Sequence, residues 1–531
     1  MFLFSLGTHV KDCRTTWCNM GKNQKKKGKG AEKTAVKTEK KLNQKMKKQL
    51  KLTGEEDIEA ILAEIEKEEQ KRAQVVKKEI AAPTRRVYAS LTPHPSKDEL
   101  LLFGGEFYNG KETTLFNDLF IYKIATNEWT LFKIPGSPPP RTSHQAVAVP
   151  SKKGELWVFG GEFSTKSESQ FYHYKDLWVL HLDNLSWERV MAGNGPSSRS
   201  GHRMVLCKRQ IILFGGYHDN LRECKYYNDV YAFNLDDRVW HKLEPSGTAP
   251  CPRSGCQMAV TPEGKIVIWG GYSKSKVKKD LEAGVSYADM YLLSPDKGDT
   301  TGLKWKWSVV KPGGMKYGAR SGVSAAFFGN CAYTFGGSVD NETEEDMTAE
   351  FFNELHSLDL QKLTWSKIVL SGKKEADKNK PRRKLKDGEE EMNVDEPREP
   401  EPEEPKETIV EDGVFTMKIG PAPVKGPDGE ATNVSNSGLP SHPHSRINTS
   451  MAVKGSKLYI YGGLYEDDDR QHTLPDFYSI DIRKFDEWKT LIECDLEGQE
   501  WIESSESEGS DSCDTSEEDI SMGSEEEEEE G

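Results

Sequence analysis

Six arginines recur along the chain at a nearly constant distance before a Gly-Gly pair. Each lies 16 to 19 residues before its pair, and an acidic residue follows the pair. A planar guanidinium binds carboxylates and carbonyls in a two-pronged geometry, so two interpretations are open. Each arginine could hold backbone carbonyls or the acid of the next repeat, or the six could form an electropositive mouth that binds an acidic peptide. These candidate partner-binding residues are Arg85, Arg141, Arg199, Arg253, Arg320 and Arg446.

Motifs for catalysis are missing from the sequence. It contains no phosphate-binding loop, no His-Glu-x-x-His and no Gly-x-Ser-x-Gly segment. The nine cysteines form no Cys-x-x-Cys pair. His144 and His202 occupy equivalent repeat positions, so we expect strand residues rather than copper ligands. The two Gly-Gly-Glu-Phe segments at 104–107 and 160–163 resemble a cyclic-dinucleotide synthase signature, but they lack its further acid. We therefore predict no enzyme, no metal and no cofactor.

The elements that position the arginines are organised around the Gly-Gly doublets. A β-rich run ends in each doublet, an alternating apolar run follows the acid, and a Trp closes most units. Four short strands per unit would form a small antiparallel sheet that cannot bury both of its faces alone. A closed ring of such sheets leaves no apolar face exposed. The doublets begin at Gly104, Gly160, Gly215, Gly270, Gly336 and Gly462.

This combination of a doublet, a spaced aromatic residue and a Trp resembles the kelch repeat. The resemblance covers roughly residues 84–370 and 445–501, with six copies in phase. It implies an all-β fold, a six-bladed kelch-type β-propeller, with disordered charged tails and a disordered insertion. The predicted segments are a lysine-rich tail (1–52), an amphipathic helix (53–80), blades one to five (84–371), the insertion (372–444), blade six with ring closure (445–501) and an acidic tail (502–531).

The two tails carry opposite charge. Residues 22–51 contain thirteen lysines and two acids, and residues 500–531 contain fifteen acids and neither Lys nor Arg. Both segments lack the apolar residues needed for a core. The lysines could make weak, salt-sensitive contact with nucleic acid or could serve only as a solvated tail. In a closed ring the two tails should emerge close together and pair loosely.

Two local features leave alternatives open. Ile58, Ile61, Leu62 and Ile65 form one stripe of a helix, which could dock on a blade of the same chain or on a partner. Blade six could close at Trp488, or it could close at Trp501 with a helical insertion over residues 485–493.

These observations favour a non-catalytic scaffold that presents one propeller face to a protein partner. There are two alternatives: a substrate receptor of a ubiquitin ligase, and a propeller enzyme. Against the first, no BTB-like domain precedes residue 85, and residues 490–494 miss the elongin-binding spacing. We expect a monomer. We also expect no membrane span, because no run of 18 apolar residues occurs. Scattered cysteines and the lack of a complete signal peptide indicate the cytoplasm or the nucleus.

Overall fold

The structure is a computed structural model that describes residues 57–372, 409–412, 415–418, 442–499 and 501, apart from 152, 220–223, 279–280, 343–346 and 468–469. The predicted lysine-rich tail (1–52) and acidic tail (502–531) lie outside the described residues, as does most of the predicted insertion (372–444).

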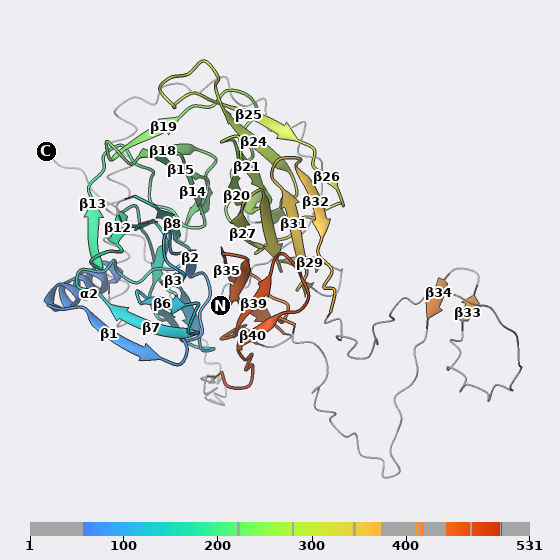
Figure 1. Cartoon of the computed structure of the whole chain (residues 1–531), viewed down its shortest axis with the longest axis horizontal. Coiled ribbons are helices and arrows are strands. Elements are labelled where there is room, and N and C mark those ends of the chain that lie inside the picture. The colour runs from blue at the N-terminus through green and yellow to red at the C-terminus, as the bar shows by residue number, and fades with distance from the viewer. Residues whose placement is uncertain are drawn as a thin grey trace, which may run out of the picture.

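Six antiparallel sheets surround a central channel, which confirms the predicted six-bladed kelch-type β-propeller (Figure 1). In each blade the first strand lies innermost and the fourth lies outermost. Blade 1 contains β2 (Ser90–Pro93), β3 (Glu99–Phe103), β6 (Leu119–Lys123) and β7 (Glu128–Lys133); blade 2 contains β8 (Gln145–Val149), β9 (Glu155–Phe159), β12 (Leu177–His181) and β13 (Ser186–Val190). Blade 3 contains β14 (Arg203–Cys207), β15 (Gln210–Phe214), β18 (Val230–Asn234) and β19 (Val239–Leu243).

The remaining blades repeat this order. Blade 4 contains β20 (Gln257–Val260), β21 (Ile266–Trp269), β24 (Met290–Pro295) and β25 (Trp305–Val310); blade 5 contains β27 (Ser324–Phe328), β28 (Cys331–Phe335), β31 (Leu355–Asp359) and β32 (Thr364–Lys367). The parallel strand β26 (Gly313–Gly314) extends blade 5 at β32. Blade 6 contains β35 (Ser450–Lys454), β36 (Lys457–Tyr461), β39 (Phe477–Asp481) and β40 (Lys489–Ile492).

The core lies between blades. The second strands are almost fully buried on both faces, and their side chains pack against the neighbouring blade. The closing Trp of a blade sits opposite an apolar residue of the third strand, as Trp240 does with Phe233 and Trp365 does with Leu358. Because such cross-strand pairs stabilise the outer edge of a sheet, one Trp per repeat holds each fourth strand in register.

Each blade consists of one continuous stretch of chain, so contacts between the first and last sheets close the ring and no strand is shared between them. Blade 6 contributes Tyr459, Tyr461 and Phe477 to a core cluster with Tyr122 and Trp129 of blade 1. Polar contacts cross the same junction: the Ser450 hydroxyl donates to the Ala89 carbonyl at 2.8 Å, and the Lys454 ammonium donates to the His94 carbonyl at 2.7 Å.

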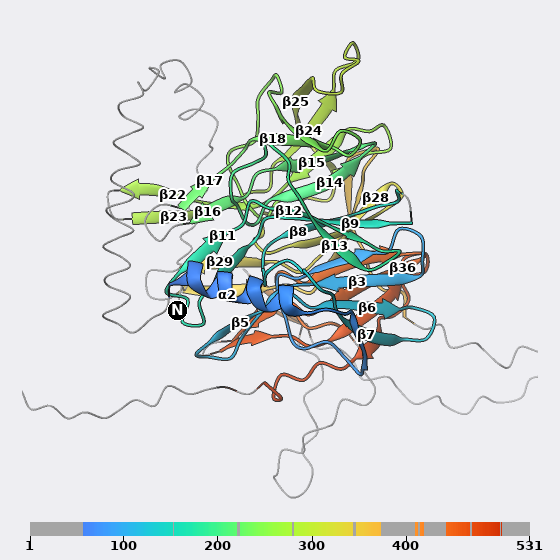
Figure 2. The ribbon, with the colours of Figure 1, turned by 90° about the vertical axis from the view of Figure 1, so that its left-hand side faces the viewer.

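A two-stranded hairpin joins the second and third strands of every blade, and all six hairpins project from one side of the ring. We call this side the crown. In Figure 2 the strands β11, β16, β17, β22 and β23 lie on the same side as helix α2 (Ile58–Lys71). The hairpins are β4 (Glu106–Tyr108) with β5 (Thr113–Leu115), β10 (Glu162–Ser164) with β11 (Phe171–His173), β16 (Tyr217–Asp219) with β17 (Cys224–Tyr226), β22 (Tyr272–Lys278) with β23 (Leu281–Ser286), β29 (Ser338–Glu342) with β30 (Met347–Phe351) and β37 (Leu464–Glu466) with β38 (Gln471–Thr473).

The N-terminal helix docks on the chain's own propeller, one of the two alternatives for the apolar stripe. Ile58 and Leu62 are buried against Phe163 and Tyr174 of blade 2. The helix is shorter than the predicted 53–80: it ends at Lys71, and β1 (Val76–Ile80) pairs with the outer strand β7 of blade 1. The apolar spacing does not continue past Ile65, so the open edge of β7 recruits the following segment as a strand.

Two further points are resolved at the C-terminal side. Trp488 is buried in the core between blades 5 and 6 and immediately precedes β40, so it closes blade 6, and no helix interrupts the described residues 485–493. The predicted disordered insertion contains a described hairpin, β33 (Ile409–Asp412) with β34 (Phe415–Lys418). The strands contain β-branched Ile409, Val410 and Thr416 and aromatic Phe415, residue types that favour local strand pairing and that the charged composition of the whole segment did not reveal.

Candidate functional site

The repeat arginines are buried ion-pair partners, so the predicted electropositive mouth is wrong. The side chains of Arg141, Arg199, Arg253 and Arg446 have no exposed surface. Each guanidinium donates to the acid of its own blade, at 2.9, 2.6, 2.5 and 2.5 Å respectively, rather than to the acid of the next one. Each also donates to the carbonyl of the first glycine of its own doublet, at 2.9 to 3.0 Å.

The charge of these arginines is neutralised inside the protein. Burial alone would lower the pKa of Arg141, but the paired Asp176 more than offsets this effect and the pKa lies above its ordinary value. Burial would likewise raise the pKa of Asp176, yet Arg141 holds it below its ordinary value. The pair is therefore ionised and internally satisfied, which leaves no donor for an acidic partner.

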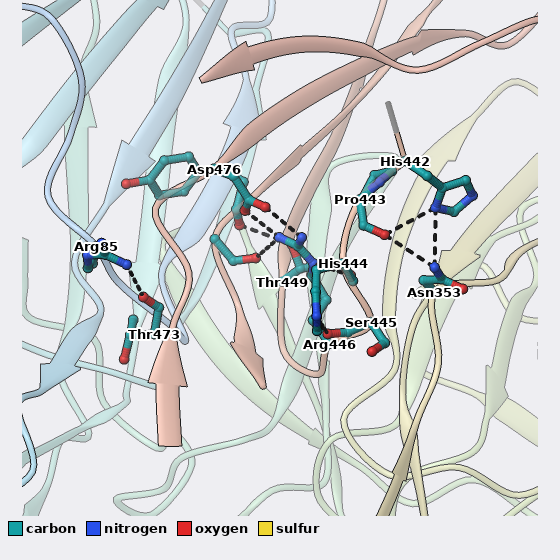
Figure 3. Close-up of polar contacts among 12 residues, drawn as sticks. Arg85, Asn353, His442, Pro443, His444, Ser445, Arg446, Thr449, Thr473 and Asp476 are labelled. Atoms are coloured by element: carbon teal, nitrogen blue, oxygen red, sulfur yellow. Dashed lines mark hydrogen bonds and ion pairs between the residues drawn. The ribbon is translucent and has the colours of Figure 1, made fainter. Parts of the chain in front are cut away.

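In blade 1 the repeat arginine is Arg86, so the prediction of Arg85 is off by one residue. Arg86 is fully buried and donates to the Gly104 carbonyl at 2.9 Å, as its equivalents do. Arg85 instead donates to the Thr473 carbonyl at 3.4 Å (Figure 3). It also lies 3.5 Å from the Asp495 carboxylate. The number of residues between an arginine and its doublet depends on the length of the turn between the first two strands. This number therefore could not identify which of the two adjacent arginines holds the repeat position. The true register is set by the β-bridge between Val87 and Glu106.

Arg320 is the most exposed of the five predicted arginines that keep the repeat position, with 13% of its side chain accessible, and it pairs with Glu354 at 2.6 Å. Arg85, Arg141, Arg199, Arg253, Arg320 and Arg446 all lie outside the wall of the central cavity. The predicted partner-binding role of these residues therefore does not fit their positions in the described structure.

The glycine doublets explain how neighbouring blades approach so closely. Gly160 has φ +64°, and a Cβ there would lie 2.7 Å from the carbonyl oxygen of Arg199 in the next blade. Gly161 has φ +92°, and its amide donates to that same carbonyl at 3.0 Å. Arginine and doublet thus form one scaffold unit: the side chain ties the loop to its own blade while the carbonyl ties it to the preceding one.

Two residues after each arginine, the backbone forms a ring around the channel. All six of these residues have φ between 51° and 62°, and all line the cavity. Hydrogen bonds link many of them around the ring, for example from the Gly255 amide to the Gly201 carbonyl at 2.9 Å and from the Asn448 amide to the Gly322 carbonyl at 2.7 Å. We call this ring the belt; its members are Tyr88, Ser143, Gly201, Gly255, Gly322 and Asn448.

The belt is symmetric in backbone but not in side chains. Blades 3 to 5 carry glycine, which adopts this conformation readily, whereas blades 6, 1 and 2 carry Asn448, Tyr88 and Ser143. A tyrosine with φ 54° is unfavourable, since positive φ suits glycine and asparagine far better. Tyr88 is therefore held in the channel at a local cost, a situation typical of functional positions.

The candidate site is the cavity of about 2270 Å³ that the belt and the crown hairpins enclose. Seven carboxylates and three basic side chains line it. The acids come from five of the six blades, so negative charge converges on the channel from most of the ring. They are Glu106, Glu162, Glu168, Asp219, Asp340, Glu466 and Asp467, and the bases are Arg203, Lys274 and Arg470.

Several of these acids have perturbed pKa values. Burial, followed by repulsion from Glu162 and Glu168, raises the pKa of Glu106 to about 8. Burial also raises the pKa of Glu162 to about 7, and burial with the charge of Glu466 raises that of Asp340 to about 6. Burial is the largest cause in each case, so these carboxyl groups keep a proton to a higher pH than exposed ones do, and a cation that entered the cavity would favour their charged forms.

Glu162 is the acid with the best-defined surroundings. The Tyr217 hydroxyl of blade 3 donates to its Oε1 at 2.7 Å, and His173 Nδ1 lies 3.4 Å from its Oε2. Burial lowers the pKa of His173 to about 4, so this imidazole is neutral at physiological pH and supplies no counter-charge. The carboxylate is positioned by hydrogen bonds without being neutralised.

The two histidines set aside as structural are structural. His144 and His202 are buried, and their rings pack edge-on against Phe103 and Phe159. Burial lowers the pKa of His144 to about 3. Within the described ranges, no group of three or more His, Cys, Asp or Glu side chains is arranged to hold a metal ion. Helix α2, the helix of the described part, lacks the length and apolar character to cross a bilayer.

Sequence reasoning missed the cavity because its residues break the repeat instead of following it. Glu106 and Glu162 directly follow their doublets, and this position next to the repeated glycines suggested that they belong to the repeat. The equivalent positions are Tyr217, Tyr272, Ser338 and Leu464, and this change of residue type at a fixed position was the signal available.

Six blades, each with the same arginine–doublet unit, form a six-bladed β-propeller. The family model described as the KLHDC2/KLHL20/DRC7 Kelch-repeats domain matches residues 89–299 and supports a kelch-repeat family for this chain. The match covers blades 1 to 3 and the first three strands of blade 4, and blades 5 and 6 show the same construction.

Relatives share the propeller region only in part. Host cell factor of Drosophila melanogaster is 27% identical over 301 residues, which cover 52% of this chain and 18% of the relative. Host cell factor 1 of Homo sapiens is 27% identical over 299 residues, covering 52% of this chain and 13% of the relative. Acyl-CoA-binding domain-containing protein 5 of Arabidopsis thaliana is 27% identical over 194 residues, covering 36% and 28%. The chain thus spans less than a third of each of these relatives.

Proposed function

We propose that this protein is a non-catalytic scaffold that binds a protein partner on the crown face, over the central cavity. The observation that carries the proposal is the contrast within each repeat: scaffold positions are alike in most blades, whereas the belt and the residues after the doublets differ from blade to blade. Differing side chains gathered at one channel mouth provide a specific surface on a symmetric frame. The resemblance to the two host cell factors is consistent with protein binding.

The opposite face offers the main competing surface. Phe327 and Phe328 end the innermost strand of blade 5 on the side away from the crown, and they are 40% and 48% exposed. Single exposed apolar residues are common on soluble proteins, and these two form a small patch. A test of the proposal must therefore compare the two faces directly.

The experiment is site-specific photo-crosslinking in cells of full-length protein. A photoreactive amino acid replaces Lys225, an exposed residue of the crown hairpin β17, or Phe328 on the opposite face. We expect a discrete protein adduct from position 225 and none from position 328. An adduct only from position 328, or none from either position, would refute the crown as the binding face.

Three expectations belong to the same proposal: weak nucleic-acid contact through residues 22–51, a monomeric state, and a cytoplasmic or nuclear location. The ubiquitin-ligase alternative receives no support from residues 490–494, since most of them form the outer strand β40 of blade 6. A propeller enzyme remains the third possibility, and the cavity carboxylates would be its natural catalytic groups.

A further inference from the structure

The cavity beneath the crown holds more acids than its own basic side chains can pair with. Seven acids face three basic residues there. Among the described residues, no ion pair joins Glu106 to a cation. Glu162 lies 3.4 Å from a nitrogen of His173, but His173 is neutral at physiological pH and contributes no positive charge. Carboxylates held together in a partly buried space attract a cation strongly, because the local dielectric constant is lower than that of water.

A second observation also points to an absent ligand. Thr473 of blade 6 lines the same cavity and is only 1% exposed, yet its hydroxyl oxygen has no hydrogen-bond partner in the described structure. A buried hydroxyl without a partner is costly, and native structures rarely leave one unsatisfied. A ligand with several N–H donors, such as an ammonium group, would satisfy it.

The chain itself carries a ligand of this chemistry close to the cavity. Helix α2 begins at the crown, where the Ile58 amide donates to the Gln170 side chain of blade 2 at 3.2 Å. Residues 52–56 separate this point from the lysine tract, and five residues reach at most about 18 Å. Residues 22–51, with thirteen lysines and two glutamates, are thus joined to the crown at the hairpin whose residues Glu168 and Phe171 line the cavity. Tethering corresponds to an effective concentration on the order of millimolar, so even weak contacts would be populated.

We propose that the lysine-rich segment of residues 22–51 occupies the acidic crown cavity of the same chain. Ammonium groups would pair with Glu106, Glu162, Asp340 and Glu466. The occupancy itself needs no partner, so its failure can be told apart from a failure of the proposed function.

The acidic tail competes for the same lysines and provides the rival outcome. Trp501 lies at the crown, with its ring 5.4 Å from that of His472 in blade 6, so residues 502–531 also start beside the cavity. If the lysines pair with the tail instead, the cavity carboxylates stay unoccupied. The two arrangements differ in which carboxylates lie beside the lysines, and this can be measured directly.

The experiment is zero-length carbodiimide crosslinking of the full-length protein at low protein concentration, followed by peptide mass spectrometry. We expect crosslinks from lysines of residues 22–51 to Glu106, Glu162, Asp340 or Glu466. In the double variant Glu106→Gln/Glu466→Gln, the crosslinks to the two remaining acids should fall about fivefold, because two charge contacts are lost. The matched control is Glu350→Gln, an exposed crown acid outside the cavity wall, which should leave them unchanged.

Three results would overturn the proposal. Crosslinks concentrated on residues 502–531 would show that the tail holds the lysines. An absence of crosslinks to the cavity acids would show an unoccupied cavity. Equal loss in the double variant and in Glu350→Gln would show that only general surface charge matters.

Discussion

Two positions that lie two residues apart in every repeat have opposite roles. The first is the arginine that follows each inter-blade loop, and the second is the belt residue that lines the channel. The first is the same residue type in all six blades, is mostly buried and is paired with an acid. The second adopts the same backbone conformation in all six blades but is Tyr, Ser, Gly, Gly, Gly and Asn in turn.

The comparison teaches where function resides in a ring of repeats. A residue that every blade needs for its own folding has to be the same in each blade. It therefore cannot distinguish the channel mouth of one propeller from that of another. Variation is tolerated where the backbone alone closes the ring, as it does in the hydrogen-bonded belt. The most regular residues of the repeat therefore indicate the scaffold, and the candidate site lies at repeat positions whose residue type differs between blades.

The largest effect that would test this contrast is expected at Arg446. Arg446 and Asp476 are both fully buried, so Arg446→Ala leaves an uncompensated charge and should destabilise the protein by about 3–5 kcal/mol in denaturant unfolding. Arg85→Ala is the matched control, since Arg85 makes only a long hydrogen bond and a partly exposed ion pair (Figure 3), and it should cost at most about 1 kcal/mol. Equal losses of stability in the two variants would show that Arg446, at the repeat position, and Arg85, next to one, contribute alike.

The next effect concerns the doublets. Gly161→Ala places a Cβ 2.6 Å from the Thr142 carbonyl oxygen at φ +92°, so we expect a loss of at least about 2 kcal/mol. At Gly455, where φ is +62° and no atom lies within 4 Å of the added Cβ, alanine should cost only about 1 kcal/mol. Thermal unfolding of both variants measures the difference. A mild effect at Gly161 would mean that the segment of Thr142 and His144 in the same blade can shift away from the doublet without loss.

How far the sequence alone could go follows from these same residues. The doublet and the closing Trp predict the blades because their roles are local and repeat six times. The choice between Arg85 and Arg86 could not be made from spacing, because turn length shifts the spacing without shifting the bridge register. The cavity could not be predicted at all from periodicity, since Glu106, Glu162, Asp340 and Glu466 come from four blades and meet only in three dimensions.

A smaller effect should appear in the pH dependence of stability. The pKa of Glu106 is raised to about 8, so between pH 4.5 and 8 the folded chain holds a proton that the unfolded chain releases. The associated stability is fully present below the unfolded pKa and is lost as the pH rises through about 8. The groups facing Glu106 are Glu162, Glu168, Tyr88 and Thr142, and none of them is a cation.

Glu106→Gln removes this proton linkage. In a chain lacking residues 1–52, so that no lysine tract can enter the cavity, the variant should gain on the order of 1–2 kcal/mol relative to its parent between pH 5 and pH 8.5, measured by thermal unfolding at matched ionic strength. Glu350→Gln should give a difference that does not change with pH. In the full-length protein the difference should be flatter, because the lysine tract that we propose to occupy the cavity would keep the Glu106 carboxylate charged. A flat difference in the shortened chain as well would show that the pKa of Glu106 is not raised in the empty cavity.

The smallest effect is expected from removing the insertion between blades 5 and 6. Both of its ends are anchored: the Gly372 amide donates to the Asp486 carbonyl at 3.1 Å, and His442 lies 3.3 Å from the Asn353 side chain. Replacing residues 373–441 with a Gly-Ser linker of about twelve residues keeps these anchors and shortens the connection roughly sixfold. Since each halving of loop length is worth about 0.6 kcal/mol, stability should rise by at most about 1.5 kcal/mol. One cooperative unfolding transition by circular dichroism should remain. Loss of that transition, or a drop in stability, would show that the β33–β34 hairpin supports the ring and that the insertion belongs to the scaffold.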